Sequence, residues 1–242
     1  MAARPGAFDE MSRTVPKITR GANDLSGGRG HPAPCPSGGP NHDDRAAASR
    51  CAPAKGHDLT LFDEMGLPQS LTRKLDRIGI SEPTPIQSHA IPHALNGHDV
   101  MGLAQTGTGK TLAFGLPLVA GLMAAPGGAA PKSVRSLILA PTRELAGQIR
   151  DALLPLVQDS PVRIGLVVGG AGIGPQIKRL DKGCDILVAT PGRLLDLIDR
   201  RALRLDAAEF LVLDEADQML DLGFIHALRR IAGLLPATRQ TM

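Results

Sequence analysis

The stretch that decides the fold of this chain reads Ala104-Gln105-Thr106-Gly107-Thr108-Gly109-Lys110-Thr111. A short apolar run, Val100–Leu103, precedes it, and apolar residues continue at helical spacing from Leu112 to Leu116. A strand, a glycine-rich turn and a helix start in this order are typical of a phosphate-binding loop, although Ala104 stands where the general pattern has Gly. The glycines let successive backbone N–H groups face inward, and the helix adds its positive amino-terminal end. We therefore expect residues 104–111 to bind a nucleoside triphosphate.

A second acidic segment completes the predicted nucleotide site. Phe210–Leu213 is a continuous apolar run, as in a strand buried on both faces, and Asp214-Glu215-Ala216-Asp217 follows it. Adjacent carboxylates at such a strand end are costly unless a cation lies opposite. In this interpretation Lys110 contacts the β- and γ-phosphates, Thr111 and Asp214 hold Mg²⁺, and Glu215 orients or deprotonates the attacking water. The alternative is that these acids only cap the next helix.

Helical and strand patterns alternate along the rest of the chain. Helices are predicted over 67–78, 84–95, 110–124, 143–154, 175–182, 193–201 and 217–235, and strands over 100–103, 136–140, 163–168, 185–189 and 210–213. This alternation predicts an α/β fold with a mostly parallel sheet and helices on both faces. Ligands then bind beyond the carboxyl ends of the strands, where residues 104–111 and Asp214 both lie.

Further segments in the same order resemble the DEAD-box ATP-dependent RNA helicases. Gly79-Ile80 and Pro83-Thr84-Pro85-Ile86-Gln87 are similar to the adenine-reading segment (Q motif) of that family, with Phe62 upstream. The side-chain amide of Gln87 can accept from the exocyclic amine of adenine and donate to the neighbouring ring nitrogen. The family often has an aromatic residue at the position of Ile80, so an apolar contact is kept while aromatic stacking is lost. The resemblance implies a RecA-like P-loop domain whose ATP contacts are Phe62, Ile80, Thr84, Gln87, Ala104, Gln105, Thr106, Gly107, Thr108, Gly109, Lys110 and Thr111.

The resemblance also implies an RNA surface. Pro141-Thr142-Arg143-Glu144-Leu145, the pair Gly169-Gly170, and Thr190-Pro191-Gly192-Arg193 match the family's RNA-gripping segments. In the family these segments hold the sugar–phosphate backbone of single-stranded RNA, largely independently of sequence. The RNA contacts expected here are Pro141, Thr142, Arg143, Gly169, Gly170, Thr190, Pro191, Gly192 and Arg193.

The domain organisation is expected to be uneven. Residues 1–58 are rich in Gly, Pro, Ala and Arg and predict a disordered tail, whereas residues 59–242 predict the RecA-like domain. Arg239-Gln240-Thr241-Met242 resembles the start of the strand that carries the family's Ser-Ala-Thr motif, so we expect this domain to be incomplete at that end and a second RecA-like domain to be absent. In RecA-like sheets that strand lies between the phosphate-loop strand and the strand at Phe210–Leu213. We expect that position for Thr241 as well.

Composition limits the other possibilities. The 242 residues are 43% hydrophobic with a net charge of only +3, which permits nucleic-acid binding without demonstrating it. The three cysteines have no short spacing, which argues against a zinc knuckle, a redox dithiol or a disulfide framework. No apolar run approaches the length of a membrane span, so we expect a cytoplasmic protein with no membrane partner.

The sequence therefore predicts the ATP- and RNA-binding half of an ATP-dependent RNA helicase that uses ATP and Mg²⁺. In the complete enzyme, ATP binding and hydrolysis would be coupled to local unwinding of RNA duplexes. Two alternatives stay open: a non-catalytic ATP- and RNA-binding module or inactive gene remnant, and another P-loop motor such as a protein or duplex-DNA translocase. Gln87 and its Pro-Thr-Pro-Ile preface disfavour the second alternative.

Overall fold

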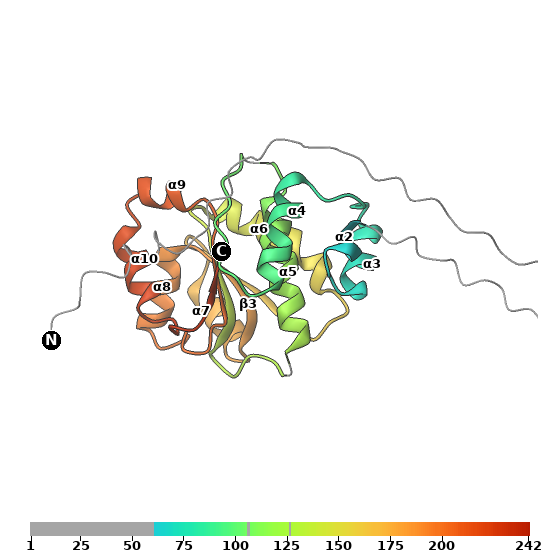
Figure 1. Ribbon diagram of the computed structural model, residues 1–242. Coiled ribbons are helices and arrows are strands. Elements are labelled where there is room, and N and C mark those ends of the chain that lie inside the picture. Colours follow the sequence, from blue (N-terminus) through green and yellow to red (C-terminus); the bar gives the residue numbers. More distant parts are fainter. Residues whose placement is uncertain (1–60, 106, 126) are drawn as a thin grey trace, which may run out of the picture. The chain divides into compact units, whose positions relative to one another are not determined.

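Parallel strands form the centre of the domain, in the spatial order β2-β3-β1-β4-β5 (Figure 1). The computed structural model describes residues 61–105, 107–125 and 127–242, so the tail predicted over 1–58 lies outside the described residues. The strands are β1 (Val134–Leu139), β2 (Ile164–Val167), β3 (Cys184–Ala189), β4 (Phe210–Leu213) and β5 (Gln240–Thr241). The predicted α/β class with a parallel sheet is confirmed.

Helices connect successive strands, as parallel pairing requires. They are α2 (Leu61–Glu64), α3 (Gln69–Arg77), α4 (Pro85–Leu95), α5 (Lys110–Ala124), α6 (Arg143–Val157), α7 (Ile173–Leu180), α8 (Pro191–Asp199), α9 (Ala216–Asp221) and α10 (Ile225–Ala232). Most of them agree with the predicted ranges to within a few residues, and α5 begins and ends at the predicted residues. In the described part of the chain, no helix is both long and apolar enough to cross a membrane.

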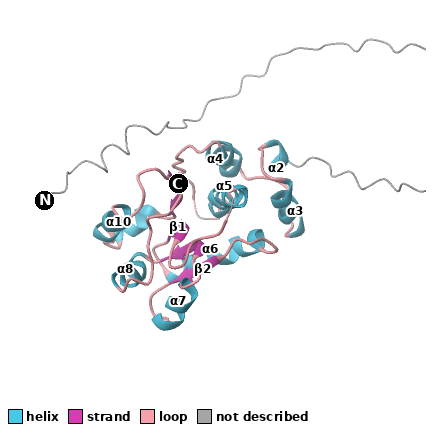
Figure 2. Ribbon diagram, turned by 90° about the horizontal axis from the view of Figure 1, so that it is seen from below, coloured by secondary structure: helices cyan, strands magenta, loops and turns pink. Residues whose placement is uncertain are grey.

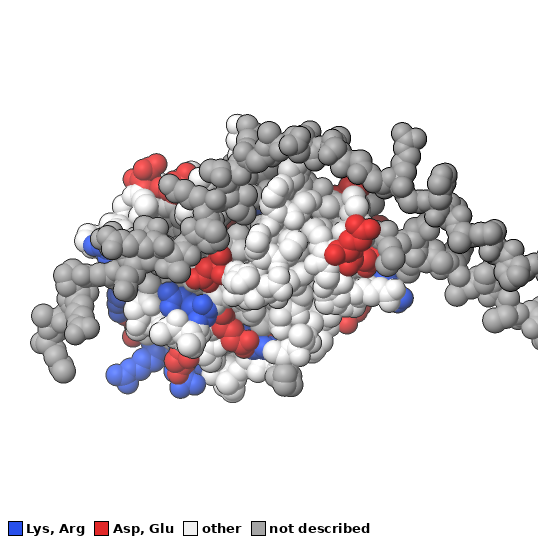
Figure 3. All heavy atoms as spheres, viewed as in Figure 1, with Lys and Arg blue, Asp and Glu red and all other residues white. Residues whose placement is uncertain are grey.

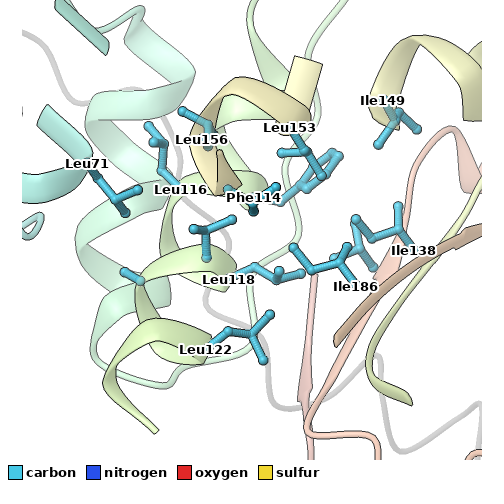
Figure 4. Close-up of a cluster of buried hydrophobic side chains, with 14 of the residues drawn as sticks. Leu71, Phe114, Leu116, Leu118, Leu122, Ile138, Ile149, Leu153, Leu156 and Ile186 are labelled. Carbon is cyan, nitrogen blue, oxygen red and sulfur yellow. The ribbon is translucent and has the colours of Figure 1, made fainter. Parts of the chain in front are cut away.

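The central strands are buried on both faces, and this burial places helices on both sides of the sheet. Every residue of β1 and of β3 is buried. Alternate residues point to opposite faces: Ile138 packs in a core with α3, α4, α5 and α6, whereas Leu137 packs in a core with α7, α8, α9 and α10. Figure 2 shows these helices on the two sides of the strands, and Figure 4 shows α5 side chains between Leu71 of α3 and the strand residues Ile138 and Ile186.

The strand predicted over 100–103 does not form in the structure. Within that stretch only Val100 makes a described ladder bond, from its N–H to the carbonyl of Thr241 at 3.0 Å. Met101 and Leu103 are 65% and 91% exposed. A strand needs neighbouring strands along its length to be stable, and this stretch has only the one bond at Val100. The position of β5 nevertheless agrees with the expected sheet order, since β5 pairs with β4 on one side and bonds Val100 on the other.

The single helix predicted over 217–235 is divided into α9 and α10. Gly223 ends α9 in the left-handed region, with φ of +80°. The Gly223 and Phe224 N–H groups bond the carbonyls of Leu220 and Met219, the pattern by which a glycine closes a helix. The apolar period continues across this break, so periodicity alone did not show it.

Helix α6 is fixed at both ends by side chains. At its start the Thr142 hydroxyl accepts a hydrogen bond from the Leu145 N–H at 3.2 Å, and at its end Lys74 Nζ donates to the carbonyls of Leu156 and Gln158 at 2.8 and 2.5 Å. These contacts satisfy backbone groups that a helix end leaves unpaired. The middle of α6 packs closely on α5, since a Cβ at Gly115 would lie 2.3 Å from Leu153 Cδ2.

The turn into β3 supplies a test of the fold. Gly183 has φ of +77°, and a Cβ there would lie 2.1 Å from the backbone oxygen of Ala130. We expect Gly183→Ala to lower the free energy of unfolding by about 2 to 4 kcal/mol, measured by urea denaturation, because backbone cannot move aside as a side chain can. The matched control is Gly97→Ala, which has φ of +79° with nothing within 4 Å of the added Cβ. Its cost should be only the backbone strain, about 1 kcal/mol. Equal losses for the two variants would contradict the packing described here.

Candidate functional site

The glycine-rich loop lies at the start of α5 with the backbone that a phosphate-binding turn needs. Gly107 and Gly109 have φ of +81° and +88°, a region that glycine enters at little cost. Gly109 is the N-cap residue, and Lys110 and Thr111 open the helix, both half-buried. The Thr108 hydroxyl donates to the Gln105 carbonyl at 2.7 Å, which closes the turn. Ala104 is half-buried and Gln105 is exposed beside this turn, whereas Thr106 lies outside the described residues.

The predicted adenine-reading segment contacts this loop directly. The amide of Gln87 bridges two elements: its Oε1 accepts from the Thr84 N–H at 3.0 Å, and its Nε2 donates to the Gly109 carbonyl at 3.0 Å. A Cβ at Gly109 would lie 2.5 Å from Gln87 Nε2, so only glycine leaves room for the amide. The structure therefore brings together residues 22 positions apart that the motifs only suggested were neighbours.

The two apolar residues of the predicted adenine site lie inside or against the core. Phe62 is 1% exposed and belongs to the core cluster that includes Leu71 and Ile91. Ile80 is half-buried and packs against the same cluster. In this conformation the Phe62 ring is part of the core and does not face solvent. Its contact with adenine stays a prediction.

The acidic pair follows β4 at the carboxyl edge of the sheet. Asp214 is 7% exposed, and its N–H donates to the carbonyl of Leu139 on β1 at 3.0 Å. Burial raises the pKa of the Asp214 carboxyl above its ordinary value; the charge of Lys110 lowers the pKa, and the charge of Glu215 raises it further. A buried carboxylate with one cation nearby is therefore held at an energetic cost.

Glu215 adopts a backbone conformation that a residue with a side chain seldom takes. Its φ and ψ are +54° and +52°, and it is the N-cap residue of α9. Strain of this kind costs about 1 to 3 kcal/mol and collects at functional positions. The turn directs the chain from β4 into α9 directly after Asp214. The alternative interpretation, in which these acids only cap a helix, does not account for the strain, since Glu215 makes no side-chain cap bond in the described structure.

A second group of predicted residues lines a cavity of about 350 Å³ beyond the carboxyl ends of β1, β2 and β3. All the predicted RNA contacts except Gly170 and Pro191 line this cavity: Pro141, Thr142, Arg143, Gly169, Thr190, Gly192 and Arg193. Pro191 is buried as the first residue of α8. Because α6 and α8 both begin at the cavity, their positive amino-terminal ends add to the two arginines, and the result is a surface suited to anions.

Gly170 leaves the space that the Arg143 guanidinium occupies. A Cβ at Gly170, which has φ of +75°, would lie 2.1 Å from Arg143 Nη1. Among the described residues, the only ion pair of Arg143 is with Glu144, at 3.9 Å, and its side chain is 58% exposed. Arg193 is held more firmly, because its Nη1 donates to the Ala171 carbonyl at 2.9 Å and its side chain is 14% exposed. Arg143 is therefore the more available of the two cations.

Two residues that the sequence reasoning did not assign also line the cavity. Glu144 follows Arg143 within a quoted segment, and Phe224 comes directly after the Gly223 break. The signal for Phe224 was the Gly-Phe pair, which the apolar period of the expected helix concealed. An aromatic side chain at such a surface can pack against a sugar or a base.

Comparisons with known proteins agree with this geometry. The profile of the DEAD/DEAH box helicase family matches residues 84–242. The chain is 48% identical over 184 residues to the ATP-dependent RNA helicase CshA of Listeria monocytogenes. It is 47% identical over 184 residues to the DEAD-box ATP-dependent RNA helicase CshA of Bacillus cereus. Each alignment covers 76% of this chain and 34% of the relative. The chain thus spans about a third of the length of these curated relatives. A crystal structure of a DEAD box protein from the hyperthermophile Methanococcus jannaschii superposes with a TM-score of 0.68 at 36% identity, over 74% of this chain and 48% of that one. The chain belongs to the DEAD/DEAH box helicase family.

Proposed function

We propose that this chain is the ATP- and RNA-binding part of an ATP-dependent RNA helicase that acts in the cytoplasm. The observation that carries the proposal is the meeting of three features beyond the carboxyl ends of one parallel sheet: the glycine-rich loop, the Asp214-Glu215 pair and the cavity lined by Arg143 and Arg193. Their placement at one end of the same sheet lets packed elements connect the ATP and RNA sites. Hydrolysis and unwinding are proposed for a protein of the relatives' full length, of which this chain matches about a third.

Gln87 is the proposed adenine reader. Each of its two amide atoms makes one hydrogen bond in the structure, and an amide has two donor hydrogens and two acceptor lone pairs. One hydrogen and one lone pair therefore remain, and these complement the exocyclic amine and ring nitrogen of adenine. Because Nε2 also holds the Gly109 carbonyl, adenine recognition is linked to the shape of the phosphate loop.

Lys110, Thr111 and Asp214 are the proposed residues around the phosphates and Mg²⁺. The fit is supported by the raised pKa of Asp214, since a divalent cation would offset the cost of its burial. The described residues contain no group of three or more His, Cys, Asp or Glu side chains able to hold a metal, so the remaining ligands would be phosphate oxygens and water, as Mg²⁺ prefers. Bound Mg²⁺ would neutralise charge on the transferring phosphoryl group. Glu215 would orient the attacking water.

The cavity of about 350 Å³ is the proposed RNA site. Arg143 and the amino-terminal ends of α6 and α8 would contact phosphates, which carry no sequence information, so binding would be largely sequence-independent. Thr142 and Thr190 are the N-cap residues of these helices and would position the backbone N–H groups toward the RNA strand.

Nucleotide selectivity tests the adenine assignment. We expect the 242-residue chain to bind ADP at least about tenfold more tightly than GDP in calorimetric titrations, because a bidentate pair to a base contributes about 1 to 3 kcal/mol of discrimination. Lys110→Ala should weaken both nucleotides together, since it removes a phosphate contact and leaves the base contact. Equal affinity for ADP and GDP would exclude Gln87 as the reader.

The buried carboxylate gives a test of the metal site. The folded pKa of Asp214 is raised, so its ionisation opposes folding at neutral pH, and this penalty disappears as the pH falls through that pKa. Asp214→Asn should therefore raise the unfolding free energy of the nucleotide-free chain by about 1 kcal/mol at pH 7, with a smaller gain at lower pH. Asp217→Asn, at an exposed position three residues further along in α9, should give no gain. Addition of Mg²⁺ with ADP should stabilise the original chain more than Asp214→Asn. A less stable Asn variant under all conditions would show that the carboxylate has a structural partner.

Salt dependence of RNA binding tests the cavity. Arg143→Ala should weaken binding of a single-stranded oligonucleotide and reduce the slope of log K against log salt by about 0.7, the contribution of one phosphate contact to a single strand. Gly170→Ala should act in the same direction, since its Cβ would displace the Arg143 guanidinium. The control Gly174→Ala, with nothing within 4 Å of its Cβ, should bind RNA normally. An unchanged salt slope for Arg143→Ala would place the RNA elsewhere.

A further inference from the structure

A larger cavity, of about 530 Å³, lies at the amino ends of the strands, at the end of the sheet opposite to Asp214. Its lining includes Lys132, which comes just before β1, and Arg204 and Leu205, which come before β4. Ser133 and Arg204 form a parallel bridge there, so the two segments are held side by side at the amino ends of their strands. Parallel strands place Asp214 and the RNA cavity at the other end of the sheet. The cavity is therefore separate from the proposed ATP and RNA sites.

Two basic residues of this cavity have the left-handed backbone conformation that favours glycine. Lys132 and Arg201 have φ of +56° and +55°. Arg201 follows α8, and the N–H groups of Arg201 and Ala202 bond the carbonyls of Ile198 and Leu197, the helix-ending pattern in which glycine is usual. A side chain in this region is strained, and strain of this kind collects at functional positions. Both residues line the cavity.

These cations have no carboxylate of their own. Among the described residues, Lys132 and Arg201 form no ion pair. Nearby, Arg200 forms an ion pair with Asp196, and Arg230 forms one with Asp199. Arg204 has only a long contact to Asp206, 3.8 Å between two side chains that are each 64% exposed. In Figure 3, Lys and Arg side chains gather at the lower left of the molecule, with acidic side chains among them. The cavity rim therefore has an excess of positive charge.

The floor of the cavity is apolar. Ile198 and Leu234 line it, and Leu234 is 42% exposed. The described lining has no aromatic side chain on which a nucleic-acid base could stack. An anion bound through charge alone would leave the apolar side chains of the floor without a partner. An apolar anchor flanked by carboxylates would use both the floor and the rim.

We propose that this cavity is a docking site for an acidic amphipathic peptide segment of a partner protein. One apolar side chain of the peptide lies between Ile198 and Leu234, and acidic residues on either side face Lys132, Arg201 and Arg204. Charge complementarity of this kind sets partner choice and association rate more than affinity, which suits a recruitment contact. Such a site would bring the helicase domain to its place of action without occupying the ATP or RNA surfaces.

The test uses the full 242-residue chain and three probes. These are a short fluorescein-labelled peptide with one leucine between runs of glutamate, the same peptide with serine for leucine, and a labelled single-stranded oligouridylate. Fluorescence anisotropy gives the affinities, and backbone amide NMR shifts give the location. We expect the leucine peptide to bind more tightly than the serine peptide and to shift amides around Lys132, Arg201 and Leu234.

The glycine-favouring backbone provides a variant that separates binding from folding. Lys132→Gly/Arg201→Gly removes two cations and relieves two strained positions, so the melting temperature should be kept or raised. Peptide affinity should fall by about 3- to 30-fold, the combined value of two exposed charge pairs. The matched control Arg73→Gln/Arg77→Gln changes the net charge equally on the exposed surface of α3 and should alter affinity by less than about twofold. Leu234→Ser should also weaken the leucine peptide and leave the serine peptide unaffected.

Several outcomes would overturn the proposal. Equal loss of affinity in the glycine double variant and in the α3 control would show non-specific attraction. Tighter binding of oligouridylate than of the leucine peptide, with shifts at the same amides, would make this a nucleic-acid surface. A wild-type dimer that Lys132→Gly/Arg201→Gly converts to monomer in sedimentation would identify a second copy of the chain as the occupant.

Discussion

Burial of β1 and β3 on both faces is the constraint on which the remaining structure depends. A strand hidden on both sides needs a layer of helices on each, and the chain can supply them only by crossing over between parallel strands. Every strand then ends at the same edge, and so does the turn that follows it. Residues far apart in the sequence, such as Thr142, Thr190 and Asp214, meet there for this reason, without any direct contact having to specify their meeting.

The features of the site that cost folding free energy lie at the carboxyl ends of the strands. Asp214 is a buried carboxylate with a raised pKa, and Glu215 is strained in the left-handed region. Neither feature would be kept for stability, because neutral or unstrained residues would fold at least as well. The apolar layers on both sides of the sheet are continuous, and they provide the free energy that tolerates these local costs.

How far the sequence predicts the structure depends on the range of the interaction. The start of α5 at Lys110 and the strand at Phe210–Leu213 follow from local signals, a glycine turn and an uninterrupted apolar run, and both agree with the structure. The stretch 100–103 has the same local signal as a strand, but its state depends on a partner elsewhere in the chain. The contacts that shape the site, Gln87 to Gly109 and Gly170 to Arg143, are equally non-local. Motifs name such residues, and only the fold gives their distances.

Helix α6 contacts three separate parts of the domain. Its first turn borders the cavity lined by Arg143, its middle packs on the helix that carries Lys110, and its last carbonyls are held by Lys74 of α3. Its 15 residues form a strut of about 22 Å at 1.5 Å per residue. Helix α6 therefore spans the distance from the cavity lined by Arg143 to the flank of the domain that α3 covers. A rigid element of this kind is the physical path along which two surfaces of one domain can be coupled.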